Sequence, residues 1–294
     1  MSRVTVRRAV VQQRWAELTD QRRHLLGAVL AVTLLLSGLT AGIPDSGGAF
    51  RARITNSTNT AAAARYFTCQ AAAVGDSAFF AYPLTENPVG TTATDVSGNT
   101  QNGTYQGTPT HSTSSACTRD GGGSTTFDGT STYVSTPTAQ TNPQTFTSEI
   151  WFRTTTTTGG ELIGFSSVQT GATNQHDRHL YMTNAGKLVF GVYNSGVYTI
   201  TSPSAYNNGA WHHTAATLSP AGLQLYVDGA QVAASTATTA AESYTGYWRI
   251  GQDNLSGWTD VPTSQYFTGQ LSYAAVYTTA LTATTIAAHN RAGR

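Results

Sequence analysis

Hydrophobic residues follow two different patterns along this chain. Near its beginning, an unbroken apolar run covers residues 25–36 and continues to residue 43 with small residues mixed in. In the body of the chain, apolar and polar residues alternate in short runs such as the segment 223–227. Successive side chains of a strand point to opposite faces, so this alternation is typical of strands that bury one face. The body is therefore predicted to consist of β-strands.

Turn residues separate the predicted strands. Asp228 and Gly229 lie between two of them and favour a type I′ hairpin turn, because that turn needs positive φ at both central positions. Segments 184–186 and 194–196 each begin with Asn and end with Gly, and they indicate two more turns. The predicted strands cover residues 50–55, 78–82, 145–154, 178–183, 187–193, 197–201, 211–218, 223–227, 230–233, 246–250 and 266–277.

Short strands without helices between them predict an all-β fold, either a sandwich or a barrel. The sequence contains no long internal repeat, which is the pattern that would indicate a propeller or a solenoid. We expect an antiparallel two-sheet jelly-roll sandwich over residues 66–294, preceded by a linker or exposed arm over residues 44–65. The only helical pattern in the body covers residues 283–291, with Thr282 as N-cap, so a short C-terminal helix is predicted.

The first 43 residues have the order of an export signal. Six arginines precede the apolar run, and small residues follow it. The run over residues 25–36 has the length of a signal-peptide core, whereas its extension to residue 43 approaches that of a spanning helix. A cleaved signal and a retained signal anchor therefore both remain open, and either would contact the membrane through an N-terminal hydrophobic helix. In both cases the body is expected to be secreted or on the extracellular face of the membrane.

The charge distribution argues against nucleic acid as a partner. Charged residues make up 11% of the chain, against roughly 25% in an average globular protein. Residues 1–53 hold eight arginines against three acids, whereas residues 54–294 hold eight basic residues against twelve acids. A protein that binds a phosphate backbone needs Lys and Arg clustered on its folded surface. The body is mildly acidic instead.

Cys69 and Cys117 are the only cysteines of the chain. Outside the cell an even pair is typical of a disulfide, although two free thiols remain the alternative. A bridge between them would stabilise the fold by roughly 4 kcal/mol through the loop that it closes.

Eight short segments, in order along the chain, carry a resemblance to a known family. They are DVSGN at 95–99 with NG at 102–103, FDG at 127–129 with YV at 133–134, FTSEIWF at 146–152, GKLVFG at 186–191, WHH at 211–213, LYVDG at 225–229, WRIG at 248–251, and FTG at 267–269 running into VY at 276–277 and AL at 280–281. The body resembles the bacterial laminin-G-like, concanavalin-A-like jelly-roll family. The resemblance implies the sandwich fold and an extracellular binding scaffold. It does not imply one ligand, because this sandwich carries lectins, adhesion modules and some hydrolases.

Catalytic patterns are weak in this sequence. Glycoside hydrolysis needs two carboxylates at one site, but none of the body's four glutamates has another acid two or four residues away. No G-x-S-x-G motif of a serine hydrolase is present either. His176 and His179 are three residues apart, so on a regular strand they are predicted to point to opposite faces. Between them, Arg178 is expected either to form a salt bridge or to contact a ligand. We therefore expect that the protein is not an enzyme, and a hydrolase is kept as the alternative.

Calcium is the cofactor that the sequence suggests. Asp95, Asn99 and Asn102 lie in a glycine-containing segment, and their oxygens are ligands that Ca²⁺ prefers. The resemblance also implies a structural Ca²⁺, although Ser272 stands where the family has an Asp. The alternative is that these side chains form Asx turns with their own backbone.

The segment 252–265 is the predicted ligand-binding loop. Aromatic side chains with polar neighbours suit sugar rings, and loops commonly carry function. Trp258 is either an exposed binding residue or a plug that closes the end of the sandwich. The predicted ligand-binding residues are Trp258, Tyr244, Tyr247, Asp253, Asn254 and Arg178.

The sequence thus predicts an exported, non-enzymatic binding module that recognises extracellular polysaccharide or a surface protein. A structural component of a surface layer or fibre is the alternative, and a glycoside hydrolase on the same fold is the second alternative.

Overall fold

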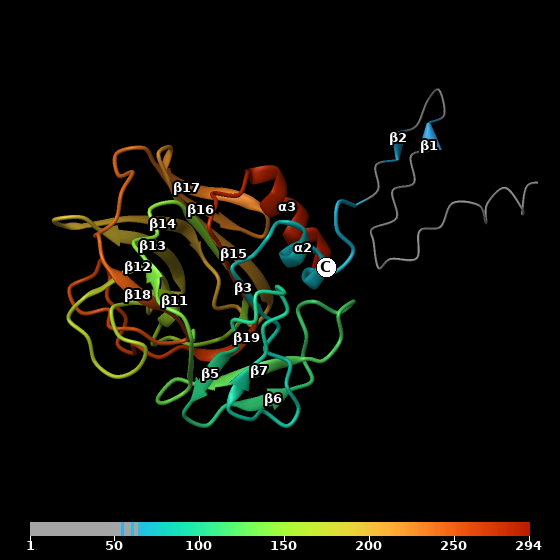
Figure 1. The fold of residues 1–294 in the computed structure, drawn as a ribbon, viewed down its shortest axis with the longest axis horizontal. Coiled ribbons are helices and arrows are strands. Elements are labelled where there is room, and N and C mark those ends of the chain that lie inside the picture. The colour runs from blue at the N-terminus through green and yellow to red at the C-terminus, as the bar shows by residue number, and fades with distance from the viewer. Residues whose placement is uncertain (1–53, 56–59, 62–63) are drawn as a thin grey trace, which may run out of the picture. The chain divides into compact units, whose positions relative to one another are not determined.

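The computed structural model of the protein describes residues 54–55, 60–61 and 64–294 (Figure 1). The predicted signal or anchor over residues 1–43 and most of the predicted arm over residues 44–65 lie outside the described residues. Of the predicted strand 50–55, the structure describes β1 (Ile54–Thr55), which pairs with β2 (Thr60–Ala61). Within the described part of the chain, no helix combines the length and the apolar character needed to cross a membrane.

Two antiparallel sheets form the body. The first sheet has eight strands, with β10 at its centre. Its strands, in spatial order, are β17 (Ala230–Ser235), β16 (Gly222–Val227), β15 (Trp211–Ser219), β10 (Phe146–Arg153), β19 (Thr268–Tyr277), β7 (Ser124–Asp128) and β6 (Thr110–Ser112), and β3 (Phe80–Tyr82) pairs with the end of β19.

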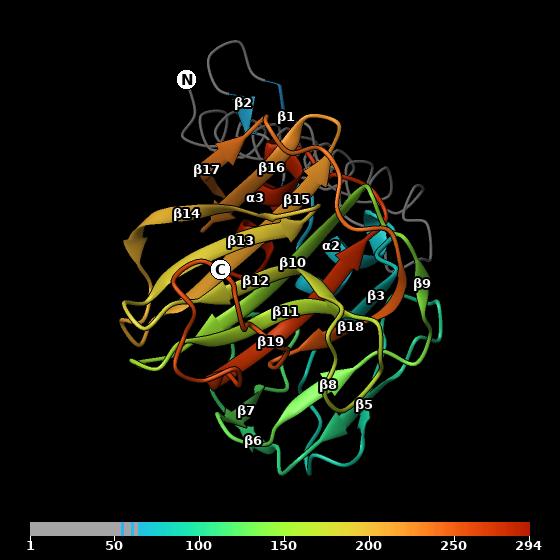
Figure 2. The same ribbon diagram turned by 90° about the vertical axis from the view of Figure 1, so that its left-hand side faces the viewer.

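The second sheet has nine strands and faces the viewer in Figure 2. Its strands, in spatial order, are β14 (Val197–Ala205), β13 (Lys187–Tyr193), β12 (His176–Met182), β11 (Gly160–Ser166), β18 (Thr245–Ile250), β8 (Tyr133–Ser135), β5 (Gly103–Gln106) and β4 (Thr92–Ala93), and β9 (Gln140–Thr141) pairs with β18. The predicted all-β, two-sheet antiparallel sandwich is confirmed.

The main hydrophobic core lies between the two sheets. Leu225 and Val227 point into it from β16, as the alternation predicts, whereas Tyr226 points to the other face. Phe146 of the first sheet meets Phe190 and Trp248 of the second, with ring centroids 6.2 and 5.2 Å apart. Burial of such a side chain contributes about 1.5–3 kcal/mol, so these contacts hold the sheets together.

The two described α-helices cover part of the outer face of the first sheet (Figure 1). α3 (Ala283–Ala292) begins at the predicted N-cap Thr282, whose side chain accepts a hydrogen bond from the backbone N–H of Thr285. Ile286 of this helix packs on Tyr226 of β16. The outer face of the second sheet is left to the loops, and there the candidate site is found.

α2 (Cys69–Gly75) corrects the prediction of a single helix in the body. Its short Ala-rich segment has no amphipathic pattern that could be recognised, but three contacts fix its start. The side chain of Thr68 caps it, and the Asp120 carboxylate accepts hydrogen bonds from the backbone N–H groups of Cys69 and Gln70. Cys69 forms the predicted disulfide with Cys117, with their Cα atoms 6.0 Å apart.

Candidate functional site

The segment between β18 and β19 folds back over the outer face of the second sheet (Figure 2). Trp258, in this segment, packs on Tyr181 and Val189 and retains 6% of its exposure. Its indole meets the ring of His179 edge-on, with centroids 4.4 Å apart. The prediction that Trp258 is exposed is therefore wrong, and its place is the outer face of the second sheet and not the end of the sandwich that the alternative gave it.

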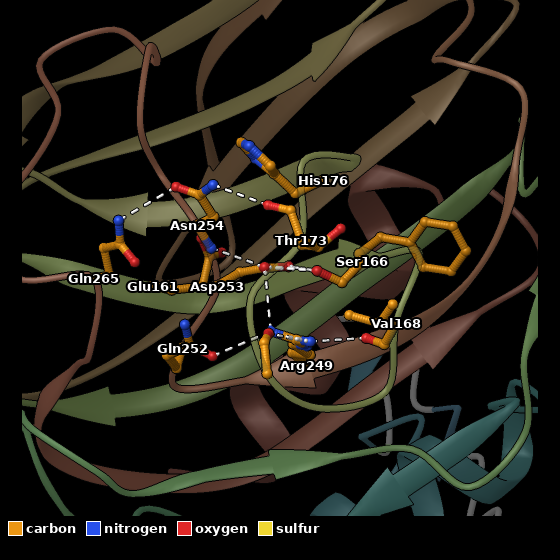
Figure 3. Close-up of polar contacts among 12 residues, drawn as sticks. Glu161, Ser166, Val168, Thr173, His176, Arg249, Gln252, Asp253, Asn254 and Gln265 are labelled. Carbon is orange, nitrogen blue, oxygen red and sulfur yellow. Dashed lines mark hydrogen bonds and ion pairs between the residues drawn. The ribbon is translucent and has the colours of Figure 1, made fainter.

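A buried ion pair lies beneath the same loop (Figure 3). Asp253 is fully buried and accepts hydrogen bonds of 2.6 and 2.9 Å from Ser166 Oγ, and one of its oxygens lies 3.6 Å from Nη1 of Arg249. The guanidinium of Arg249 also donates to the carbonyl oxygens of Val168 and Gly171, at 2.8 and 2.9 Å. A charge can remain buried only where it is paired and hydrogen-bonded. This network fixes the loop to the segment after β11.

A pocket of about 350 Å³ opens next to Arg249, and we call it the amide pocket. Gln265 Nε2 donates to Asn254 Oδ1 at 3.3 Å, and Asn254 Nδ2 donates to the carbonyl oxygen of Thr173 at 3.1 Å (Figure 3). The lining of the amide pocket contains two aromatic rings, three amides and one guanidinium but no carboxylate. The lining residues are Tyr133, Gly171, Ala172, Thr173, Arg249, Gln252, Asn254, Gln265 and Tyr266.

His176 and His179 lie on the same side of the sheet, so the prediction of opposite faces is wrong. Nδ1 of His176 is 3.1 Å from Nε2 of His179. The cause is Arg178, whose φ of 55° interrupts the strand where the pairing of β12 with β11 is irregular. A bulge of this kind shifts the alternation of side chains by one residue.

The two histidines lead inward to a buried carboxyl group. Nδ1 of His179 lies 2.8 Å from Glu161 Oε2, and Glu161 and His179 are fully buried. Burial raises the pKa of Glu161 well above its usual value. Burial, together with the charges of His179 and Arg249, lowers the pKa of His176 to about 4. His176 is therefore neutral near pH 7.

A second pocket, also of about 350 Å³, lies beside His176, and we call it the histidine pocket. Tyr193 at the end of β13 forms part of its wall and is 38% exposed. The lining residues are Asn174, His176, Tyr193, Val197, Glu242, Ser256, Gly257 and Trp258.

The predicted ligand-binding residues are placed very differently. Asn254 lines the amide pocket, and Asp253 lies beneath it as the partner of Arg249. Trp258 lines the histidine pocket with the small part that stays exposed. Tyr247 is half-buried on β18 and is not in the lining of either pocket.

Arg178 and Tyr244 belong to the interior, which corrects their predicted role. Arg178 forms the alternative salt bridge, with Asp177 at 3.0 Å, and its guanidinium also donates to backbone carbonyl oxygens of residues 143 and 242. The Tyr244 hydroxyl donates to the Phe165 carbonyl oxygen at 2.6 Å. These groups are used within the fold and do not face a ligand.

Five residues of the amide pocket were not predicted from the sequence as ligand-binding residues: Arg249, Gln252, Gln265, Tyr133 and Tyr266. Gln252 and Gln265 are the two ends of the predicted binding loop, so the loop itself was a usable signal. Arg249 lies on a strand with the pattern of a core segment, and Tyr133 comes from a distant strand. No pattern in the sequence brings these two together.

The side chains predicted to bind calcium form hydrogen bonds with other groups of the protein. Both Asp95 carboxylate oxygens accept hydrogen bonds, from the backbone N–H groups of Ala81, Ser97 and Gln101 and from the Ser97 hydroxyl. Asn102 Oδ1 accepts from the Asp95 N–H, and Asn99 presents its amide nitrogen to two carbonyl oxygens. This geometry is that of the Asx-turn alternative. Calcium binding itself stays a prediction.

Comparison with known proteins agrees with this fold. A family model described as concanavalin A-like lectin/glucanases superfamily matches residues 128–287. The binding domain of botulinum neurotoxin DC, in complex with SialylT, aligns with a TM-score of 0.53 at 11% identity over 75% of this chain and 52% of that chain. Domain 4 of AbnA, an extracellular GH43 arabinanase from Geobacillus stearothermophilus, in complex with arabinotriose, aligns with a TM-score of 0.48 at 18% identity, over 71% of this chain and 96% of that chain. A comparison with curated proteins finds no match.

Proposed function

Because this chain belongs to the concanavalin A-like lectin/glucanases superfamily, we propose that it is a non-enzymatic module that binds carbohydrate in the amide pocket. The superfamily fold alone does not decide this function, because it carries both binding modules and hydrolases. The observation that carries the proposal is the composition of the amide pocket.

The chemistry of the amide pocket suits a sugar. The rings of Tyr133 and Tyr266 lie with their centroids 6.3 Å apart and provide apolar surface for the C–H groups of a sugar ring. The amides of Gln252, Asn254 and Gln265 each offer both donors and an acceptor, which matches hydroxyl groups that also do both. Polar side chains that converge beside aromatic rings can fix the orientation of a ligand.

The position of the acidic residues supports binding rather than hydrolysis. Glu161 and Asp253 come from different parts of the chain and lie under the same loop, but both are fully buried. A glycosidase must place two carboxyl groups on either side of the scissile bond. These two carboxyl groups are not in the lining of the amide pocket.

We further propose that the protein acts outside the cell, secreted or on the extracellular face of the membrane. The Cys69–Cys117 disulfide supports this location, because disulfides persist in oxidising compartments. The six arginines before the apolar run of residues 25–36, which is the order of an export signal, support this location as well.

A glycan array tests the function. Purified protein is applied in Ca²⁺ and in EDTA, and variant Gln265→Ala is compared with Gln231→Ala, which removes an exposed amide on β17 of the first sheet. We expect binding of the wild type in both buffers and a loss of about five- to tenfold in affinity for Gln265→Ala, the cost of one lost hydrogen bond. Gln231→Ala should bind like the wild type.

Three results would contradict the proposal. No bound glycan, together with polymerisation of the protein, would favour a surface-layer or fibre component. Release of sugar from a polysaccharide would favour a hydrolase. Equal affinity of Gln265→Ala and the wild type would place the binding site elsewhere.

A further inference from the structure

We propose that the ligand is an oligosaccharide of several units and that the histidine pocket is a second subsite for it, next to the amide pocket. This inference rests on the proposed function and extends it from one sugar to a chain. Its basis is the position of the two pockets and the side chains that they share.

The two pockets are separated by a single pair of chain segments. Thr173 lines the amide pocket, and the next residue, Asn174, lines the histidine pocket. Likewise Asn254 lines the first and Ser256 the second. Because consecutive Cα atoms are about 3.8 Å apart, the pockets are neighbours.

One hydrogen bond forms the boundary between the pockets. Asn254 Nδ2 donates to the Thr173 carbonyl oxygen, and Figure 3 shows His176 on the far side of this bond from Arg249 and Gln252. A linear ligand that fills the amide pocket can continue over this bond into the histidine pocket. A single sugar unit can occupy only one of them.

The histidine pocket has the same kind of lining as the first. Tyr193 is an aromatic side chain that is far more exposed than most tyrosines of the sheets, and Trp258 contributes an edge. Polar groups come from Asn174, Ser256 and Glu242. Apolar surface beside hydroxyl-binding groups again suits a sugar ring.

His176 is held in place for one specific hydrogen bond. If Glu161 accepts a hydrogen bond from Nδ1–H of His179, then Nε2 of His179 is an acceptor and Nδ1–H of His176 donates to it. If Glu161 is protonated and donates, every bond of the chain is reversed. Either way Nδ1 of His176 is used and Nε2 remains for a ligand hydroxyl, which can donate or accept.

Glu161, the buried carboxyl group to which the His176–His179 hydrogen bonds lead, is unfavourable for the stability of the fold. Glu161 Oε1 is buried and has no hydrogen-bond partner among the residues that the structure describes. A buried acceptor without a partner loses its hydrogen bonds to water and gains none in the fold. Residues that break the rules of stable folding in this way are expected at functional sites. This cost supports a role for the His176–His179–Glu161 chain beyond packing.

Calorimetry with oligosaccharides of increasing length tests the second subsite. The probes are malto-, cello-, xylo- and arabino-oligosaccharides together with their single sugar units, titrated into the full chain. We expect affinity to rise with length for the series that binds. Tyr193→Ala should lower affinity about tenfold for the longer members and leave the shortest unchanged, whereas Gln265→Ala should weaken all lengths. His176→Ala should behave like Tyr193→Ala.

Tyr198→Ala is the matched control, because Tyr198 is also an exposed tyrosine of this sheet, 46% exposed, but is not in the lining of the histidine pocket. Affinity that is equal for short and long members, with Tyr193→Ala and Tyr198→Ala indistinguishable, would overturn the second subsite alone. Binding of no oligosaccharide here and no glycan on the array would overturn the proposed function and this inference together.

Discussion

Gly164 of β11 lies directly beside two buried polar groups of the candidate site. A Cβ atom at this position would lie 2.8 Å from Nδ1 of His179 and 3.0 Å from Oδ2 of Asp253. Both neighbours are fully buried and held by hydrogen bonds, so neither can move aside freely. The lack of a side chain at this one residue therefore allows the carboxylate and the imidazole to lie side by side over the sheet.

The substitution Gly164→Ala should consequently destabilise the protein. Overpacking of a filled interior costs about 1–3 kcal/mol, and we expect a loss of that size in the free energy of unfolding, measured with urea. Gly90→Ala is the control, because a Cβ atom there meets no other atom within 4 Å. Equal stability of the two variants would contradict the close approach at Gly164.

Single residues are also the scale at which the sequence is least informative about the site. Arg178 adopts positive φ, a conformation usual for Gly and Asn but rare for Arg, and this reverses the side on which His176 lies. Trp258 stands in a polar segment, yet it packs on the sheet beside Gly191, where a Cβ atom would lie 3.0 Å from its ring. Both outcomes depend on neighbours from other strands, which no local pattern reveals.

At the scale of elements, regular alternation and turn chemistry were sufficient for most of the two sheets. The Asp228-Gly229 turn has positive φ at both residues, as its sequence predicts, and β13 covers the predicted residues 187–193. β11 was not predicted, because its residues are buried on both faces and show no alternation of polar and apolar positions. The short strands β4 to β9 were not predicted either. β11 carries Glu161 and Ser166, so the polar network of the site could not be anticipated.

The disulfide gives a prediction about α2. Cys69 and Cys117 are 48 residues apart, and in the chain-entropy model a loop of this length is worth roughly 4 kcal/mol. The double substitution Cys69→Ser and Cys117→Ser should lower the free energy of unfolding by about that amount, because the unfolded chain regains the conformational freedom that the closed loop removes. Reductant should shift the urea midpoint of the wild type and leave that of the variant unchanged. A wild type that is insensitive to reductant would contradict the prediction.

On the scale of the whole described body, one cluster of titratable groups ties both ends to the first sheet. Glu149 on the central strand β10 lies 2.9 Å from Nδ1 of His289 on α3. The other ring nitrogen of His289 lies 2.8 Å from Asp76 at the end of α2, and Tyr277 donates to Glu149 at 2.5 Å. The first and last helices of the described body thus share one buried histidine.

Protonation of His289 should therefore control global stability. Burial alone would lower its pKa, but the charge of Glu149 and hydrogen bonds to Glu149 and Asp76 raise it to about 9, from 6.5. For Glu149, burial is outweighed by His289 and His213, so its pKa is lowered. The contribution of His289 to the free energy of unfolding is then complete below pH 6.5. The contribution of Glu149 is complete above the usual pKa of Glu, about 4.3.

We expect the free energy of unfolding, measured with urea, to fall by about 3 kcal/mol as the pH rises from 6.5 through 9, because over this interval the folded protein keeps the proton on His289 and the unfolded chain does not, so that unfolding releases a proton. It should also fall below about pH 4, where Glu149 becomes protonated in the unfolded chain but stays ionised in the folded protein. His289→Gln should abolish the fall above pH 6.5. His111→Gln, on the edge strand β6, should follow the wild type. If the wild type keeps constant stability between pH 6.5 and 9, or if both variants lose the dependence alike, then the helices are held to the sheet by packing and not by this charged cluster.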